Sequence, residues 1–138
     1  MAIERVWPKD VYVRQAPHNQ GKVYAQVVKA TNVRTTIHVA GTMSFDKDQN
    51  MVGEGDMRLQ VRTIMENIRR SLAAVGAMPR DVVRVKSYVT DIDAFLREGS
   101  QEYVGFFGDA LPASTLVGVT ALTDPRCMVE IEAYAEME

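Results

Sequence analysis

Apolar residues recur at helical spacing in the middle of the chain and form one stripe between residues 56 and 75. Asp56 can cap the start of such a helix, and Gly76 is a natural residue just beyond its end. Glu66, Arg69 and Arg70 lie off the stripe and should face solvent. We therefore expect an amphipathic helix over residues 56–75. The stripe consists of Val61, Ile64, Met65, Ile68, Leu72 and Val75.

Runs of β-branched residues predict strands on both sides of this helix. A turn at Thr31-Asn32 should join the first two strands, because Asn tolerates left-handed backbone angles. A second helix should begin at Asp91 or Asp93 and end near Gly108. The expected strands are residues 23–29, 35–40, 82–89, 114–120 and 127–135, and the aromatic residues of the second helix that should face inward are Phe95, Tyr103, Phe106 and Phe107.

The order of these elements indicates the fold class. Residues 1–21 contain Pro8, Pro17 and Gly21 and are expected to be irregular. The remaining elements follow the order ββαβαββ, which is typical of an α+β fold with helices on one face of a sheet. The length of 138 residues suggests a single domain, residues 1–138, with its own core.

The last two strands predict which side chains face away from the helices. The odd-numbered residues 131–135 should face the helices, so that Glu130 and Tyr134 face away. On strand 114–120 the even-numbered residues, Ser114 and Leu116 among them, share one face, which we assign to the same open side as Glu130. That side then mixes polar and apolar side chains, which favours contact with another subunit.

Composition excludes several classes of function. The net charge is −2 and no basic cluster occurs, which argues against nucleic acid as a partner. The N-terminus lacks an apolar signal segment, and no window is long and apolar enough to span a membrane. Cys127 is the only cysteine, so no disulfide can form within the chain, and a cytoplasmic location is expected. His18 and His38 are too few for a metal cluster, so no metal is expected.

Several short motifs, in this order and spacing, resemble the Rid family of reactive-intermediate deaminases, also called the YjgF family. Residues 112–119 resemble the closing signature of that family, which begins Pro-Ala-Arg or Pro-Thr-Arg, and residues 129–133 follow it as the last strand. The resemblance covers most of the chain. Further matches are Ala40-Gly41, Asn67-Ile68, Leu72, Gly76, residues 81–85, residues 88–91, Phe95, Tyr103 and Phe106-Phe107 before Pro112.

The resemblance implies a chorismate-mutase-like fold: a mixed sheet with two helices on one face, assembled as a homotrimer with a ligand cleft between neighbouring subunits. In family members with deaminase activity, the cleft binds a small imine or enamine acid such as the tautomers of 2-aminoacrylate. Water then converts it to a 2-keto acid and ammonia. No cofactor is implied.

Carried over position by position, the resemblance gives roles to five residues. Glu130 matches the glutamate that positions the attacking water, Tyr24 a tyrosine that lines the cleft, and Gly41 a glycine whose backbone approaches the ligand. Ala40 stands where a serine is usual, and Leu116 replaces a smaller residue, which makes the cleft more apolar. Each residue also has a structural interpretation: an interface glutamate, a packed tyrosine or a glycine that ends a strand.

Ser114 is the main departure from the family pattern, because it occupies the position of the signature arginine that holds the substrate carboxylate. Arginine offers two charge-assisted hydrogen bonds in a fixed fork, whereas serine offers one neutral donor. We therefore expect poor activity toward 2-aminoacrylate. Arg14, Arg34 or Arg126 could replace the missing cation, although a solvated surface position is the simpler interpretation for each.

Four functions remain in competition. The first is hydrolysis of an imine or enamine other than 2-aminoacrylate; some relatives that lack the arginine act on larger unsaturated amino acids such as 2-aminomuconate. The second is a non-catalytic trimer that binds a metabolite and regulates a partner. A ribonuclease or translation inhibitor is disfavoured by the acidic balance of the chain. Ser114 as a nucleophile is disfavoured because no G-x-S-x-G elbow surrounds it and no histidine is near in sequence.

Overall fold

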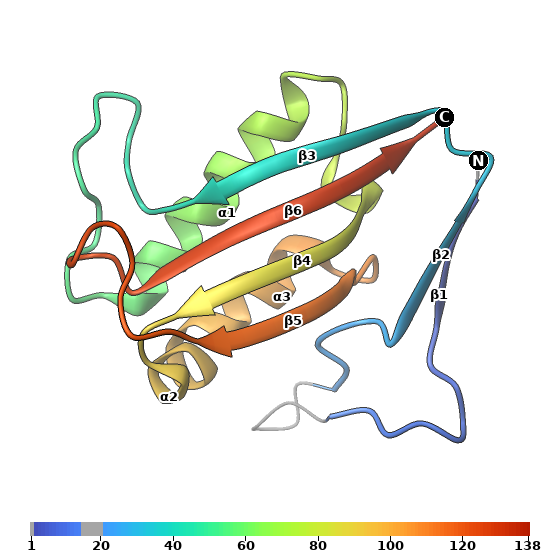
Figure 1. Cartoon of the computed structure of the whole chain (residues 1–138), viewed down its shortest axis with the longest axis horizontal. Coiled ribbons are helices and arrows are strands. Elements are labelled where there is room, and N and C mark those ends of the chain that lie inside the picture. The colour runs from blue at the N-terminus through green and yellow to red at the C-terminus, as the bar shows by residue number, and fades with distance from the viewer. Residues whose placement is uncertain (1, 15–20) are drawn as a thin grey trace.

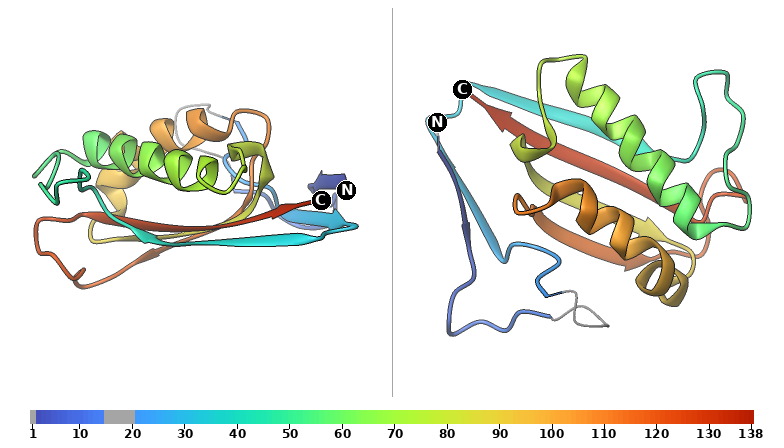
Figure 2. Two further views of the ribbon diagram at one scale, coloured as in Figure 1. Left: turned by 90° about the horizontal axis from the view of Figure 1, so that it is seen from above. Right: turned by 180° about the vertical axis from the view of Figure 1, so that it is seen from behind.

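The computed structural model describes residues 2–14 and 21–138, so that the predictions made for Pro17 and His18 lie outside the described residues. The main body is a four-stranded sheet with helices on one face only (Figures 1 and 2). The other face is open to the viewer in Figure 1. The strand order across the sheet is β3-β6-β4-β5.

The sheet is mixed, as the predicted fold requires. β3 (Thr35–Thr42), β6 (Val129–Met137) and β4 (Val82–Val89) are antiparallel neighbours. The edge strand β5 (Ala113–Gly118) runs parallel to β4, because the second helical segment carries the chain back across the sheet. The predicted α+β architecture, with helices on one face of a mixed sheet, is therefore confirmed.

The first helix, α1 (Met57–Ala73), lies where the apolar stripe predicted it. Asp56 caps it, and its carboxylate accepts a hydrogen bond of 3.0 Å from the backbone N–H of Leu59. The prediction was wrong at Val75, which is 56% exposed because the helix has already ended. The buried stripe begins earlier than expected. Its members are Met57, Gln60, Val61, Ile64, Met65, Ile68 and Leu72.

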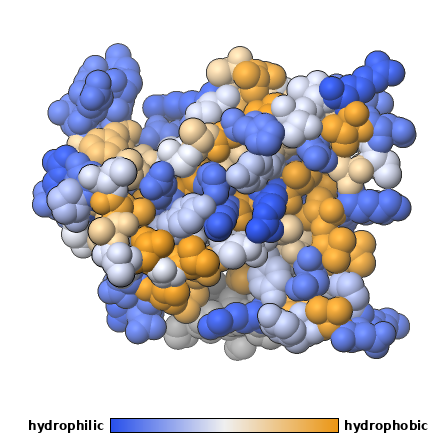
Figure 3. Space-filling view, in the orientation of Figure 1, coloured by the Kyte–Doolittle hydropathy of each residue, from blue (hydrophilic) through white to orange (hydrophobic). Residues whose placement is uncertain are grey.

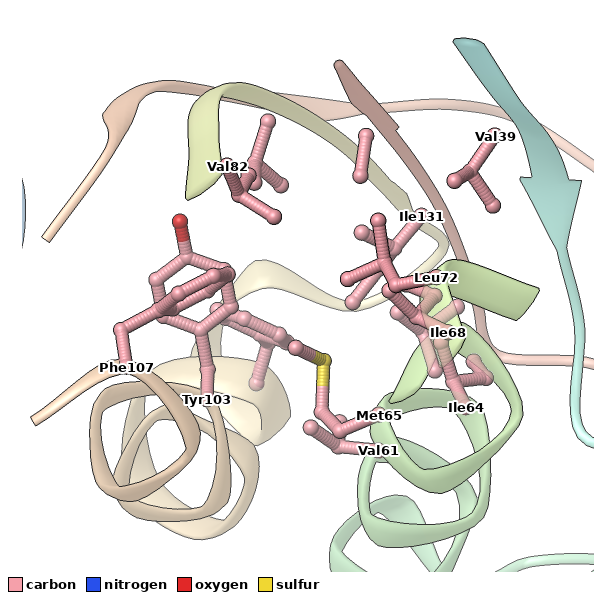
Figure 4. Packing of buried hydrophobic residues seen from close by; sticks show 14 of the residues in the cluster. Val39, Val61, Ile64, Met65, Ile68, Leu72, Val82, Tyr103, Phe107 and Ile131 are labelled. Carbon is pink, nitrogen blue, oxygen red and sulfur yellow. The ribbon is translucent and has the colours of Figure 1, made fainter. Parts of the chain in front are cut away.

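The second helical segment has three parts: α2 (Ile92–Ala94), a π-helical turn η3 (Phe95–Gly99) and α3 (Ser100–Phe107). The Asp91 carboxylate caps its start through the N–H of Ala94. Tyr103 and Phe107 of α3 pack beside α1 under the sheet (Figure 4). Phe106, which was also predicted to face inward, is half-buried and packs against the same cluster. A short 3-10 turn, η2 (Pro79–Asp81), precedes β4.

The N-terminal region corrects the expectation that residues 1–21 are irregular. β1 (Ala2–Val6) pairs with β2 (Val27–Thr31) in a separate two-stranded sheet that projects beyond the main body (Figures 1 and 2). Neither strand has a strongly buried face, so β1 lacks the periodic apolar pattern by which strands are predicted. Asn32 has a φ of 57° and makes the predicted turn, but β2 pairs with β1, not with β3.

β2 also begins four residues later than predicted. Residues 23–25 are held instead by bonds to other segments: the indole N–H of Trp7 donates to the Tyr24 carbonyl at 2.8 Å, and the Ala25 N–H donates to the Pro112 carbonyl at 2.9 Å. These contacts bring Tyr24 beside β5. No helix in the described part of the chain is both long and apolar enough to cross a membrane.

Candidate functional site

A cavity of about 380 Å³ lies beside the edge strand β5, on the same side of the sheet as the helices. The second helical segment, β5 and two short stretches of the N-terminal region form its walls. Its lining residues are Tyr12, Arg14, Val23, Tyr24, Ser87, Ile92, Phe95, Leu96, Ser100, Tyr103, Val104, Ser114 and Leu116. Three predicted site residues, Tyr24, Ser114 and Leu116, are therefore brought together here.

The position of Ser114 and Leu116 corrects the predicted face of β5. Ser114 is aligned with Val85 of β4, and Leu116 is aligned with Ser87. Val85 and Ser87 are buried beneath the helices, and aligned residues of neighbouring strands point to the same face. Ser114 and Leu116 thus face the helices, not the open side. Alternation along β5 predicts which residues share a face, but an edge strand that is half-buried on both faces does not indicate which face is inside.

The cavity has an apolar wall and a polar end. Phe95, Leu96 and Val104 of the second helical segment form the wall together with Leu116. A second hollow of about 280 Å³ shares Tyr12, Tyr24 and Ser114 with the cavity and is lined by polar atoms almost throughout. A molecule bound here would therefore meet apolar side chains at one end and hydrogen-bonding groups at the other.

Tyr103 lines this cavity and carries a buried hydroxyl that has no hydrogen-bond partner in the described part of the chain. Its side chain is only 5% exposed, and its hydroxyl lies at the end of the ring nearest the sheet (Figure 4). Burial raises the pKa of the phenol, while Ser114 opposes the rise as a polar neighbour. The contact between the two hydroxyls nevertheless falls outside standard hydrogen-bond geometry. The phenol therefore remains protonated and can donate a hydrogen bond.

Tyr24 fixes the backbone at the mouth of the cavity, the side that Arg14 lines. Its hydroxyl accepts a hydrogen bond of 2.9 Å from the backbone N–H of Arg14, while its carbonyl accepts from Trp7. The Lys22 ammonium lies 4.0 Å from the centroid of the Trp7 ring, in a cation–π contact. These contacts fix the backbone of residue 14 at the cavity and leave its side chain exposed at the mouth.

The other predicted site residues, Ala40, Gly41 and Glu130, lie on a different part of the sheet. The pairing of β3 with β6 is irregular between Val39 and Thr42, so that the backbone of Gly41 lies directly against the Glu130 side chain. A Cβ at residue 41 would collide with the Glu130 carboxylate. Glycine is needed here for the close approach, and it holds a half-buried carboxylate on the open face.

The two groups of predicted residues do not form one site within a single chain. Ser114 is aligned with Val85 of β4, whereas Glu130 is aligned with Tyr88, three residues further along the same strand. At about 3.3 Å per residue, the two lie roughly 10 Å apart along the strand direction, and they point to opposite faces of the sheet. A site that uses both must take them from two copies of the chain.

The structure also distinguishes the three arginines considered as replacements for the missing cation. Arg126 forms a bidentate pair with Asp124, with N–O distances of 3.0 and 2.8 Å, and holds the pKa of that carboxyl at about 2. Arg34 lies in the turn before β3 and does not line the cavity. Only Arg14 of the three lies at the cavity.

A polar network that sequence reasoning missed occupies the open face. Glu132 accepts hydrogen bonds from Tyr88 at 2.7 Å and from Tyr134 at 3.1 Å, and it raises the pKa of Tyr134. His38 packs edge-on against Tyr134, and Lys86 lies over the Tyr88 ring. Figure 3 shows hydrophobic and hydrophilic residues intermixed across this face, as the alternation along β6 predicted.

Comparison with known proteins agrees with this architecture. Residues 14–137 match the family described as Endoribonuclease L-PSP. The chain is 32% identical over 128 residues to a RutC family protein of Pyrococcus horikoshii, with 93% of this chain and 97% of that protein covered.

Two solved structures are also similar. One is the Rid family protein YyfB from Yersinia pestis, whose function is described as unknown: the TM-score is 0.87 at 29% identity, over 99% of this chain and 100% of that one. The other is a member of the YjgF/YER057c/UK114 family from Mycobacterium tuberculosis, at 35% identity and a TM-score of 0.67, over 83% of this chain and 86% of that one. With the fold and the sequence in agreement over nearly the whole length, the chain belongs to the Rid family, also called the YjgF family.

Proposed function

We propose that this protein hydrolyses small imine or enamine compounds to a keto compound and ammonia, in a cleft shared by two subunits of a homotrimer. The observation that carries the proposal is the contact between Gly41 and Glu130. A glycine without room for a side chain exposes its backbone next to a half-buried carboxylate. This arrangement suits a carboxylate that must hold water beside a bound molecule.

The proposed reaction needs only a base and a water molecule. Glu130 accepts a proton from water as the water oxygen attacks the imine carbon, and the C=N double bond becomes a single bond in a carbinolamine. Glu130 returns this first proton to the nitrogen to give the NH2 group of the carbinolamine. It then transfers the proton of the new hydroxyl to the nitrogen, so that the carbonyl forms as the C–N bond breaks and ammonia leaves. The enamine tautomer enters the same route after protonation at carbon.

The substrate is proposed to differ from 2-aminoacrylate. Ser114 cannot supply the arginine fork, and each charge-assisted bond of such a fork contributes about 1.5–3 kcal/mol. Loss of the fork should lower the binding affinity for a small acid by about ten- to a hundred-fold. Leu116, Phe95 and Leu96 give the cavity an apolar wall that a compound with a larger body would fill better.

The homotrimer completes the proposed site. The cavity that contains Tyr24, Ser114 and Leu116 would meet Ala40, Gly41 and Glu130 of a neighbouring subunit. Two observations support this arrangement: each group occupies a different part of the surface, and the open face carries a network of polar and aromatic groups typical of a subunit contact.

The test is the turnover of imino acids that an amino acid oxidase generates in place, followed by trapping of the remaining imine with semicarbazide. Glu130→Gln should abolish turnover and leave the assembly unchanged, because glutamine keeps the shape but cannot accept the proton. Glu136→Gln, on the same strand and the same face, is the matched control and should keep full activity. Unchanged turnover in Glu130→Gln would refute catalysis by this carboxylate. If the wild type is inactive on all imines but still binds their keto acids, the non-catalytic metabolite-binding trimer is the better conclusion.

A further inference from the structure

We propose that Arg14 replaces the missing signature arginine, and that the cavity beside β5 takes a monocarboxylate with a branched or aromatic body. The inference rests on the proposed function and names the substrate class of the same site. It is carried by three features: an unpaired cation at the mouth of the cavity, the orphaned Tyr103 hydroxyl buried beneath its floor, and an apolar wall.

The cation is available for a ligand. In the described part of the chain, Arg14 forms no ion pair, and no carboxylate lines the cavity. Other arginines near β5 are engaged: Arg5 donates to the Leu111 and Arg80 carbonyls, and Arg84 donates to the Thr115 hydroxyl. Because Tyr24 fixes the backbone of Arg14, the guanidinium can reach a carboxylate without ordering a long segment first.

The orphaned hydroxyl points independently to a ligand. Buried polar groups are nearly always hydrogen-bonded, and a buried phenol without a partner requires an explanation. Tyr103 lines the cavity, its hydroxyl is buried without a hydrogen-bond partner among the described residues, and its polar neighbour Ser114 lines the same cavity. A carboxylate held by Arg14 at the mouth could accept a hydrogen bond from the Ser114 hydroxyl, which would then accept one from the buried Tyr103 hydroxyl and so pair the orphaned donor.

The apolar wall selects the body of the ligand. At about 30 Å³ for each water-sized group, the cavity holds roughly a dozen such groups, which is about twice the number of heavy atoms in a three-carbon imino acid. Phe95, Leu96, Val104 and Leu116 would cover the excess with apolar surface. A second carboxylate would lie against these side chains without a cation, so a dicarboxylate should bind poorly.

The test is isothermal titration calorimetry with 4-methylpentanoate and with 4-methylpentanamide, its neutral counterpart of similar shape. We expect the wild type to bind the acid at least about ten-fold more tightly than the amide. Arg14→Gln should weaken binding of the acid by about ten- to a hundred-fold and change binding of the amide by less than about two-fold. Arg34→Gln removes an arginine that does not line the cavity and should leave both affinities unchanged. Arg14→Lys, which keeps the charge but loses the fork, should bind the acid more tightly than Arg14→Gln does.

The Tyr103 hydroxyl and the apolar wall of the cavity are tested separately. Tyr103→Phe removes the orphaned hydroxyl and keeps the ring, so binding of the acid should fall by about three- to ten-fold. Acetate, which has no apolar body, should bind at least about ten-fold more weakly than 4-methylpentanoate.

Several results would overturn the inference. These are equal affinity of the wild type for acid and amide, no binding of either compound, or wild-type affinity for the acid in Arg14→Gln. Unchanged binding of the acid in Tyr103→Phe would show that the Tyr103 hydroxyl does not contribute to binding. Tight binding of acetate would show that the apolar wall does not select the body of the ligand. None of these measurements needs catalysis, because neither compound can be hydrolysed as an imine. Failure of the Glu130 experiment is therefore distinguishable from failure of this one.

Discussion

At the scale of single residues, Gly41 is expected to matter both for the proposed activity and for the stability of the fold. The irregular pairing of β3 and β6 places its backbone against the Glu130 carboxylate, so that the smallest side chain would displace the group proposed to hold water. Substitution here differs from most glycine substitutions because the obstacle is a functional side chain and not an unfavourable backbone angle.

We expect Gly41→Ala to lower turnover by at least about ten-fold and to destabilise the fold by about 1–3 kcal/mol, the usual cost of overpacking. Gly105→Ala is the control: it lies in α3 with nothing near its added Cβ, and alanine favours the helix by about 0.5–1 kcal/mol. Turnover and urea denaturation of both variants provide the measurement. Wild-type turnover in Gly41→Ala would show that the Glu130 position is not critical.

At the scale of elements, Gln60 ties helix α1 to the start of β6. It is the polar member of the buried stripe and is 0% exposed. Its amide group donates to the Gly53 carbonyl at 2.9 Å and to the Arg126 carbonyl at 3.1 Å, and its oxygen accepts from the Met128 N–H at 2.8 Å. Three backbone groups in two loops thus depend on the side chain of Gln60 for their hydrogen bonds. The last of them, the N–H of Met128, lies two residues before Glu130 in the chain.

Gln60→Leu should therefore lower the free energy of unfolding by at least about 2 kcal/mol, because leucine fits the volume but leaves those backbone groups without partners. Gln101→Leu, on the exposed surface of α3, should change it by less than about 0.5 kcal/mol. Urea denaturation monitored by circular dichroism compares the two. Equal stabilities would mean that water replaces the lost hydrogen bonds.

At the scale of the whole molecule, the chain is expected to assemble as a trimer. The open face carries the Glu132 network, and the β1–β2 sheet projects with Val6 and Val27 each more than 40% exposed. Such surfaces are better explained by a subunit contact than by solvent.

Light scattering should give about three times the chain mass of 15.4 kDa, with no change on dilution through the micromolar range. Because Glu132 bridges two tyrosines on that face, Glu132→Ala should shift the equilibrium toward smaller species. A monomer at all concentrations would contradict both the assembly and the shared cleft.

Sequence reasoning succeeded where burial is strongly one-sided. The stripe on α1 and the alternation on β6 are read directly from residue type. The buried faces of both were predicted correctly apart from Val75 and the first turn of α1, although β6 spans Val129–Met137, two residues later than the predicted 127–135. It failed at the edges. β1 and β5 have little contrast between their faces, so β1 was missed and Ser114 was assigned to the wrong side of the sheet.

The candidate site was predictable only in part for the same reason. Tyr24, Ser114 and Leu116 do share a cavity, and Gly41 does contact Glu130. The contribution of Tyr103 could not be foreseen, because an inward-facing tyrosine in a helix is usually a packed residue whose hydroxyl has a partner. Only the three-dimensional contacts show that this hydroxyl has none among the described residues.

The separation of Ser114 and Glu130 on opposite faces has a genetic consequence. In the proposed trimer, each cleft combines the Arg14 side of one chain with the Glu130 side of the next. When chains damaged at Arg14 assemble at random with equal numbers of chains damaged at Glu130, about one cleft in four receives an intact residue from each side. Two alleles that are each inactive alone would therefore restore partial function together, and a single damaged allele would be recessive rather than dominant.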